Sequence, residues 1–254
     1  MIVNQSFKNN FLERERIIGL GKDISGQTTL LGKQFHFVDG LSYLYMHYEI
    51  FEKQSYQFVS EKTQPIIVDC GSNVGMTIVY MKHIYPNAKI FAYEPDPQLF
   101  SILSTNINNF NLKNISLIPK AVWHENRNLN FVSDGNEGGK VTEGKEGITV
   151  EGVSLSEQLS VFKEIDMLKI DIEGAEVSVF ESIRNQLNKV ENIFMEYHSP
   201  TGGSQKLDRL LKILSENNFR YYIENITPRT KPFLNESSKI EPFDMQINIC
   251  AYKN

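Results

Sequence analysis

The sequence has few of the features that mark secreted or membrane-spanning proteins. Only two cysteines occur in 254 residues, Cys70 and Cys250, and both lie in apolar runs, which favours buried free thiols over a disulfide or a metal site. No stretch approaches the roughly 18 apolar residues that a membrane span needs, and the N-terminus lacks the apolar core of a signal peptide. We therefore expect a cytoplasmic protein that does not insert into membranes.

Positive charge is also scarce. Lys and Arg total 26 against 31 Asp and Glu, so the net charge is −5, and no long basic run occurs. Because nucleic-acid binding depends on clustered positive charge, this balance argues against nucleic acid as the main partner. The hydrophobic fraction of 41% is ample, at this length, for the core of one domain with appendages.

Strand and helix patterns alternate from about residue 65 onward. Short apolar runs, typical of strands covered on both faces, are separated by segments with apolar residues at helical spacing. The predicted strands are 66–70, 89–93, 115–118, 166–171, 190–197, 219–223 and 245–252. The predicted helices are 74–85, 97–110, 174–187 and 207–217, with a short one from 154. This order predicts a Rossmann-like, doubly wound α/β fold with a mostly parallel sheet.

Two regions depart from this alternation. Residues 129–132 and 148–153 flank a segment rich in glycine and charge, which predicts an inserted hairpin whose tip either closes over a bound acceptor or is a surface loop. Residues 1–60 are predicted to form a small N-terminal cap on the main domain, residues 61–254. The aromatic side chains of this cap, among them Tyr43, Tyr45 and His47, either pack in the core or line the acceptor pocket.

The first candidate site follows the strand 66–70. Open α/β sheets bind ligands beyond the carboxyl ends of their strands, and Asp69 with the loop Gly71, Ser72, Asn73 and Gly75 falls at such an end. Glycine permits a close approach of the ligand to the backbone, and the next helix offers unpaired N–H groups to a carboxylate or phosphate. This loop is therefore predicted to bind a nucleoside cofactor.

Two cofactor classes compete for this loop. A dinucleotide requires G-x-G-x-x-G, whereas here Asn73 stands at the middle position between Gly71 and Gly75, and the loop contains no Lys or Arg. A pyrophosphate would gain little from such a loop, especially beside Asp69. S-adenosylmethionine, which carries a sulfonium, an ammonium and a carboxylate but no phosphate, is the better match. Asp69 would help to hold its amino-acid end, unless this carboxylate only caps the turn.

A second acid stands where a ribose would lie. Glu94 ends the next predicted strand about 20 residues after the loop and is followed by Pro95 and Asp96. A carboxylate at this position accepts hydrogen bonds from ribose hydroxyls in either cofactor class, so Glu94 alone does not discriminate between them. Asp96 is also the expected N-cap of the helix 97–110.

Further acids and one histidine follow two later strands. Asp171 ends the strand 166–171 and would face the ligand crevice, while Glu173 is expected to begin a helix, where an acid is structurally stabilising. Strand alternation places Glu196 and His198 on one face, with Tyr197 opposite. A histidine paired with nearby acids beside a cofactor crevice is a candidate for proton transfer.

These motifs together resemble the FkbM-type family of S-adenosylmethionine-dependent methyltransferases. The resemblance begins near residue 49 and is carried by residues 68–75, 93–97, 106–114, 120–122, 169–176 and 196–198, of which Lys-Ile-Asp-Ile-Glu-Gly-Ala-Glu is the most specific. It implies a seven-stranded sheet with an antiparallel last strand, and it adds Ala121 and Asp171 to the cofactor-binding residues. It also implies methyl transfer to a hydroxyl of a sugar, glycan or natural product.

Methyl transfer to a hydroxyl requires alignment of the reactants and a group that accepts the proton. We expect His198 to be this base, oriented by Glu196 or Asp171. In a competing interpretation, the three residues bind a divalent cation that polarises the acceptor oxygen. No spacing motif demands a metal, so none is predicted.

Two other functions stay open: a nicotinamide-dependent oxidoreductase, and a cofactor-binding partner subunit without catalysis. Formation of a homo-oligomer is also left open.

Overall fold

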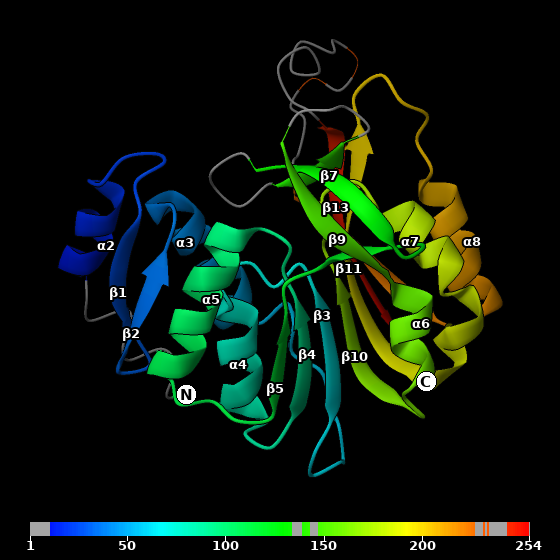
Figure 1. The fold of residues 1–254 in the computed structure, drawn as a ribbon, viewed down its shortest axis with the longest axis horizontal. Coiled ribbons are helices and arrows are strands. Elements are labelled where there is room, and N and C mark those ends of the chain that lie inside the picture. Colours follow the sequence, from blue (N-terminus) through cyan, green and yellow to red (C-terminus); the bar gives the residue numbers. More distant parts are fainter. Residues whose placement is uncertain are drawn as a thin grey trace.

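The computed structural model describes residues 11–133, 139–142, 147–226, 231, 233 and 243–253. Its centre is a seven-stranded sheet in the order β12-β13-β11-β10-β3-β4-β5 (Figure 1). The strands are β3 (Ile66–Cys70), β4 (Lys89–Tyr93), β5 (Ile115–Ile118), β10 (Ile165–Ile170), β11 (Val190–Pro200), β12 (Arg220–Asn225) and β13 (Phe243–Tyr252). All paired neighbours are parallel except β13, which runs antiparallel to β11 and β12. The predicted mostly parallel sheet with an antiparallel last strand is confirmed.

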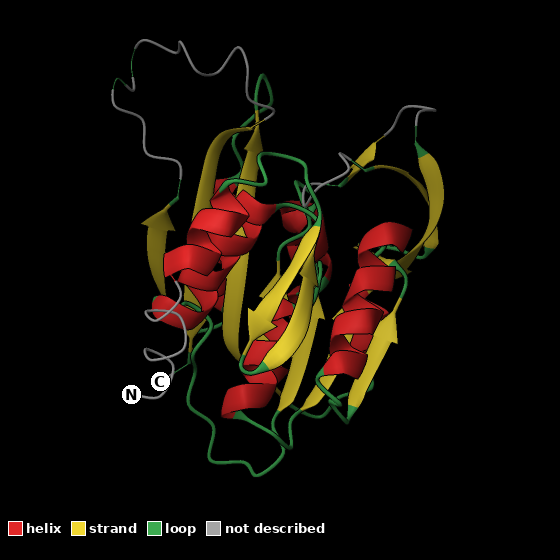
Figure 2. Cartoon of the chain, turned by 90° about the vertical axis from the view of Figure 1, so that its left-hand side faces the viewer, coloured by secondary structure: helices red, strands yellow, loops and turns green. Residues whose placement is uncertain are grey.

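Helices cover both faces of this sheet (Figure 2). One face packs against α4 (Met76–Ile84) and α5 (Pro97–Asn109), and the other packs against α6 (Leu155–Ser160), α7 (Glu176–Ser182) and α8 (Leu207–Glu216). Neighbouring residues of β3 show the alternation, because Ile67 belongs to the first of these cores and Val68 to the second. Burial on both faces explains why the parallel strands have nearly continuous apolar sequences.

The N-terminal elements pack on the side of α5 (Figure 1). They are α2 (Phe11–Ile18), the antiparallel pair β1 (Gly26–Leu30) and β2 (Lys33–Phe37), α3 (Gly40–His47) and the π-helix η1 (Tyr48–Glu52). Asn106 of α5 ties them to the sheet, since its amide accepts from His36 N and donates to His36 O and Val74 O. Tyr43 and His47 are buried in this shared core, whereas Tyr45 is 52% exposed.

A second, four-stranded sheet has the order β6-β9-β7-β8. The predicted hairpin is present as β7 (Arg127–Val132) paired antiparallel with β9 (Ile148–Ser154). Sequence analysis did not predict β6 (Ala121–Trp123) or β8 (Lys140–Thr142). Most of the hairpin tip lies outside the described residues, so its role as a lid stays a prediction. Among the described helices, none is long and apolar enough to cross a membrane.

The prediction of one helix over residues 174–187 is wrong, and its N-terminal end matters for the site. It divides into α7 and a 3₁₀ helix, η2 (Arg184–Lys189), and α7 begins only at Glu176. Glu173 and Gly174 both have left-handed backbones, with φ of 56° and 103°, which no α-helix can include. Glu173 therefore belongs to a strained loop rather than to a helix start. A smaller difference is that β11 continues to Pro200, so His198 lies within the strand.

Candidate functional site

Two cavities lie at the carboxyl ends of the parallel strands. The first, which we call the β4 cavity, has a volume of about 620 Å³ and is lined by Tyr93, Glu94 and Pro95 among others. The second, the β11 cavity, has a volume of about 770 Å³ and is lined by Glu196, Tyr45 and other residues. Both volumes suit a small-molecule ligand and include space open to solvent.

The two cavities share part of their walls. The residues that line both come from the loops after β3 and β10, and they are Gly71, Asn73, Asp171 and Glu173. A ligand in one cavity would therefore lie next to a ligand in the other, across these two loops.

Gly71 permits the close approach of the two loops. Its φ is +85°, and a Cβ atom at this position would lie 1.8 Å from the carbonyl oxygen of Asp171. The Asp171 N–H donates to the carbonyl of Cys70 at 3.1 Å, which holds the loops together. Any side chain at Gly71 would push them apart, because the clash is with backbone and not with a movable side chain.

Glu94 fixes the turn after β3 to the end of β4. Its carboxylate is 4% exposed and accepts from the backbone N–H of Asn73 at 2.8 Å and of Asp96 at 2.9 Å. Burial raises the pKa of Glu94 to about 7, although these two hydrogen bonds act in the opposite direction. The same carboxylate lines the β4 cavity, as a ribose-binding acid would.

Some of the other predicted cofactor residues line a cavity, and some do not. Pro95 and Ala121 line the β4 cavity, and Ser72 lines the β11 cavity. Gly75 is the N-cap of α4 in a left-handed conformation, and Asp96 caps α5 by accepting from Gln98 N and Leu99 N. Neither capping residue lines the two cavities.

Asp69 also lies behind the walls, next to a buried lysine of β10. Its carboxylate is 3.5 Å from Lys169 Nζ, and burial raises the pKa of Asp69 despite that neighbour. Lys169 Nζ in turn donates to the carbonyl of Gly71 at 2.7 Å and to Asp171 Oδ2 at 3.3 Å. Burial opposes the charge on Lys169, but the carboxylates of Asp171 and Asp69 outweigh it and raise the lysine pKa. Sequence analysis missed Lys169, although a lysine between two acids in a buried strand is an available signal.

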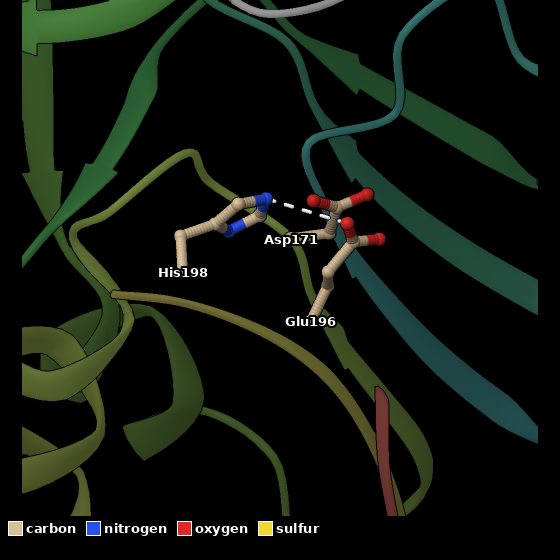
Figure 3. A group of neighbouring side chains, drawn as sticks. All are labelled: Asp171, Glu196 and His198. Atoms are coloured by element: carbon tan, nitrogen blue, oxygen red, sulfur yellow. Dashed lines mark ion pairs between the residues drawn. The ribbon is translucent and has the colours of Figure 1, made fainter. Parts of the chain in front are cut away.

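The structure brings the predicted trio of Asp171, Glu196 and His198 together beside the β11 cavity (Figure 3). Asp171 and Glu196 line this cavity, whereas the buried His198 lines neither cavity. One ligand atom from each residue lies within 4.8 Å of the others. His198 is 2% exposed, and its Nε2 is 3.3 Å from Glu196 Oε1 and 3.5 Å from Glu173 Oε2. Its Nδ1 is 3.0 Å from Oε1 of the buried Glu176. Carboxylates thus face both nitrogens of the ring.

This environment controls the charge of the imidazole and its neighbours. Burial opposes a charged His198, but hydrogen bonds with Glu176 and Glu196 outweigh it and raise the His198 pKa to about 12. Burial raises the pKa values of Glu173 and Glu196, and the nearby charge of Asp171 acts in the same direction on both. This environment therefore favours the doubly protonated, charged form of the His198 ring, and a cation bound at Nε2 would have to displace the proton there.

Sequence analysis missed several wall residues of the β11 cavity. Asn248 of β13 pairs with Glu196 in the register of β11 and β13 and lines the cavity, as does the buried Tyr56. Tyr45 is the only one of the three aromatic candidates from the N-terminal region that lines it. The pairing of distant segments decides these positions, and no local sequence signal reports it.

Comparisons with known proteins point to one family. The sequence profile of the methyltransferase FkbM domain matches residues 69–221. The chain is 26% identical over 216 residues to the methyltransferase sdnD of Sordaria araneosa, covering 70% of this chain and 83% of that protein. It is 26% identical over 159 residues to the 2-O-methyltransferase NoeI of Sinorhizobium fredii, covering 54% of this chain and 65% of NoeI.

One solved structure supports the fold. The crystal structure of a methyltransferase FkbM from Methylobacillus flagellatus superposes with a TM-score of 0.50 at 15% identity. The match covers 76% of this chain but only 45% of that longer one.

Proposed function

The chain belongs to the FkbM methyltransferase family, and from this premise we propose that it transfers a methyl group from S-adenosylmethionine to a hydroxyl oxygen. The acceptor would be a sugar, a glycan or a hydroxylated natural product. The observation that carries the proposal is the meeting of two cavities at Asp171 and Glu173, one lined by the buried acid Glu94 and the other by several carboxylates. The similarity to NoeI, a 2-O-methyltransferase, supports oxygen as the acceptor atom.

The residues that line the β4 cavity support the choice of S-adenosylmethionine as the cofactor. Glu94 would accept from the ribose hydroxyls, and Leu99, Val122 and Phe131 offer apolar surface to the adenine ring. Among the described residues, no lysine or arginine lines this cavity, which disfavours the pyrophosphate of a nicotinamide cofactor. When bound, S-adenosylmethionine supplies a methyl group made electrophilic by its sulfonium.

The residues at the meeting point would align the acceptor and receive its proton. Asp171 and Glu173 line both cavities, so a hydroxyl held beside them would face the donor side. The hypothesis that His198 is the base requires a free ring nitrogen, and carboxylates lie against both of its nitrogens. We assign proton transfer to Glu173 instead, because its carboxylate borders both cavities and retains access to them.

The walls of the β11 cavity suit a neutral, hydroxyl-rich acceptor. Glu49, Glu196 and Asn248 offer oxygen acceptors, and Tyr45 and Tyr56 offer aromatic surface. Lys169 is the only described cation on the wall, and it is already held by the Gly71 carbonyl and Asp171. An anionic acceptor would therefore find no free cation among the described residues of this wall.

The test is methyl transfer with a donor whose methyl group carries deuterium. The purified chain would be incubated with this donor and a panel of glycosides and hydroxylated metabolites, and the products analysed by mass spectrometry. We expect a labelled methyl ether on at least one neutral polyol. Labelling confined to amines, or none in any acceptor together with oxidation of NADH, would contradict the proposal.

A further inference from the structure

We propose that Asp171, Glu196 and His198 bind a divalent cation of the Mn²⁺ or Mg²⁺ class at the wall of the β11 cavity, with Asp171 on the part of that wall that both cavities share. The cation site goes beyond methyl transfer and can be tested without it. Its role in catalysis, polarising the acceptor oxygen so that the hydroxyl loses its proton more readily, rests on the proposed function.

The spacing of the three side chains fits a shared ion. Their ligand atoms lie within 4.8 Å of one another, and His198 Nε2 is 3.3 Å from Glu196 Oε1. Ligand atoms around one such ion, each at about 2.1 Å from it, are separated by about 3–4 Å. The three residues come from the ends of two adjacent strands, β10 and β11, and their side chains point toward one another (Figure 3).

The histidine has the outer partner that a metal ligand usually has. Oε1 of Glu176, a residue that is 0% exposed, lies 3.0 Å from His198 Nδ1 and also accepts from the Gly174 N–H at 2.8 Å. In metal sites, such a carboxylate accepts the N–H of the outer ring nitrogen and directs the other nitrogen to the ion. Here the other nitrogen, Nε2, faces Glu196 and Glu173.

A second observation, independent of this cluster, also points to a ligand in the same cavity. Asn248 is 4% exposed and lines the β11 cavity, but its Oδ1 atom has no hydrogen-bond partner among the described residues. The residue pairs with Glu196 across β11 and β13, so both side chains lie on one face of the sheet. A buried amide oxygen without a partner is costly, and a hydrated cation or a donor group of the acceptor would satisfy it.

The donor set also restricts the kind of ion. Two carboxylates and one imidazole suit Mn²⁺, Mg²⁺ or Fe²⁺, whereas soft ions such as Cu⁺ prefer thiolates. The free thiols, Cys70 and Cys250, line neither cavity. Mn²⁺ is the best probe of this class, because its paramagnetic resonance spectrum reports bound and free ion separately.

The experiment is a titration of the chelator-treated full chain with Mn²⁺, followed by paramagnetic resonance. We expect one site per chain, and we expect Asp171→Asn or Glu196→Gln to weaken it by at least tenfold. Replacing the outer partner, Glu176→Gln, should weaken it by about 10–100-fold. The matched control is Glu49→Gln, which removes a carboxylate from another part of the same cavity wall and should leave the Mn²⁺ affinity unchanged.

Two further readouts keep the proposal falsifiable. Mn²⁺ should raise the melting temperature of the wild type but not that of Asp171→Asn. A cooperative melting transition of Asp171→Asn without Mn²⁺ checks that this variant is folded. No Mn²⁺ binding by the wild type, or equal weakening by Glu49→Gln, would overturn the cation site. Full methyl transfer in the presence of EDTA would refute the catalytic role and leave the proposed function standing. Mn²⁺ binding without methyl transfer to any acceptor would support the cation site and contradict the proposed function.

Discussion

The two cavities of the site are built in different ways. The β4 cavity is formed by successive strand ends and the loops that follow them, with Gly71, Glu94 and Ala121 in chain order, and by Phe131 and Val141 of the inserted sheet. The β11 cavity instead combines the N-terminal helix α3, the ends of β10 and β11, and Asn248 near the end of the chain. Its walls can therefore change through distant segments without disturbing the other cavity. This difference suggests that cofactor binding and acceptor choice are separately adjustable.

The largest effect is expected from a substitution of Glu173, one of the four residues that line both cavities. Glu173→Gln removes the proposed proton acceptor while nearly preserving its shape, so kcat should fall by about 10²–10⁴-fold. The affinity for S-adenosylhomocysteine, measured by calorimetry, should stay within about threefold of the wild type, because only the proton-accepting oxygen has been changed.

Glu181→Gln is the control for this variant, since Glu181 lies on the surface of α7 and pairs with Arg209 away from the cavities. It should keep full activity. Unchanged turnover in Glu173→Gln would return the role of base to His198.

Alanine substitutions at two glycines distinguish the stability cost of separating the two loops from the cost of a left-handed backbone alone. Gly71 and Gly21 both have φ of +85°, but a Cβ at Gly21 would meet nothing within 4 Å. Gly21→Ala should cost about 1–2 kcal/mol of unfolding free energy, the cost of a left-handed alanine. Gly71→Ala should cost at least about 2 kcal/mol more, because the backbone of Asp171 must move.

Urea unfolding measures both alanine variants, and the soluble yield reports on Gly71→Ala if that variant does not fold. Equal losses for the two variants would show that the contact between the loops is not needed.

A substitution in the β11 cavity should change acceptor binding without changing cofactor binding. Tyr45→Ala removes aromatic surface from the β11 cavity, so the acceptor KM should rise about tenfold while the affinity for S-adenosylhomocysteine stays the same. Tyr48→Ala is a matched control, since both tyrosines are 52% exposed but Tyr48 does not line the cavity. A loss of cofactor affinity in Tyr45→Ala would mean that the two cavities do not act separately.

The smallest expected effect is a pH dependence on the cofactor side. Because burial raises the pKa of Glu94 to about 7, the carboxylate is charged above that pH and protonated below it. Only the charged form accepts hydrogen bonds with both oxygens, so the affinity for S-adenosylhomocysteine should fall by up to about tenfold from pH 8 to pH 6. Glu94→Gln should bind more weakly at pH 8 and show a flat profile. An affinity that rises toward pH 6 would contradict this assignment.

The same contrast explains which parts of the structure could be predicted from the sequence. The bounds of β3 and β4 were predicted correctly, and so was the position of Glu94 just after β4, because apolar runs and turn residues are local signals. The helix expected from residue 174 begins only at Glu176, because Glu173 and Gly174 have left-handed backbones that place them in a loop.

The walls of the β11 cavity were beyond the reach of local patterns. Asn248 joins Glu196 only through the antiparallel pairing of β13 with β11, and Tyr45 reaches the cavity only because the N-terminal elements pack beside the sheet. The trio of Asp171, Glu196 and His198 was predicted from strand ends and alternation, but the buried carboxylate of Glu176 behind the histidine was not.

Calorimetry of the purified chain tests the central claim most directly, with S-adenosylmethionine, S-adenosylhomocysteine and NADH as separate ligands. We predict saturable binding of both adenosyl compounds, weakened at least tenfold by Glu94→Ala, and no binding of NADH. Tight binding of NADH with no heat from either adenosyl compound would contradict the account.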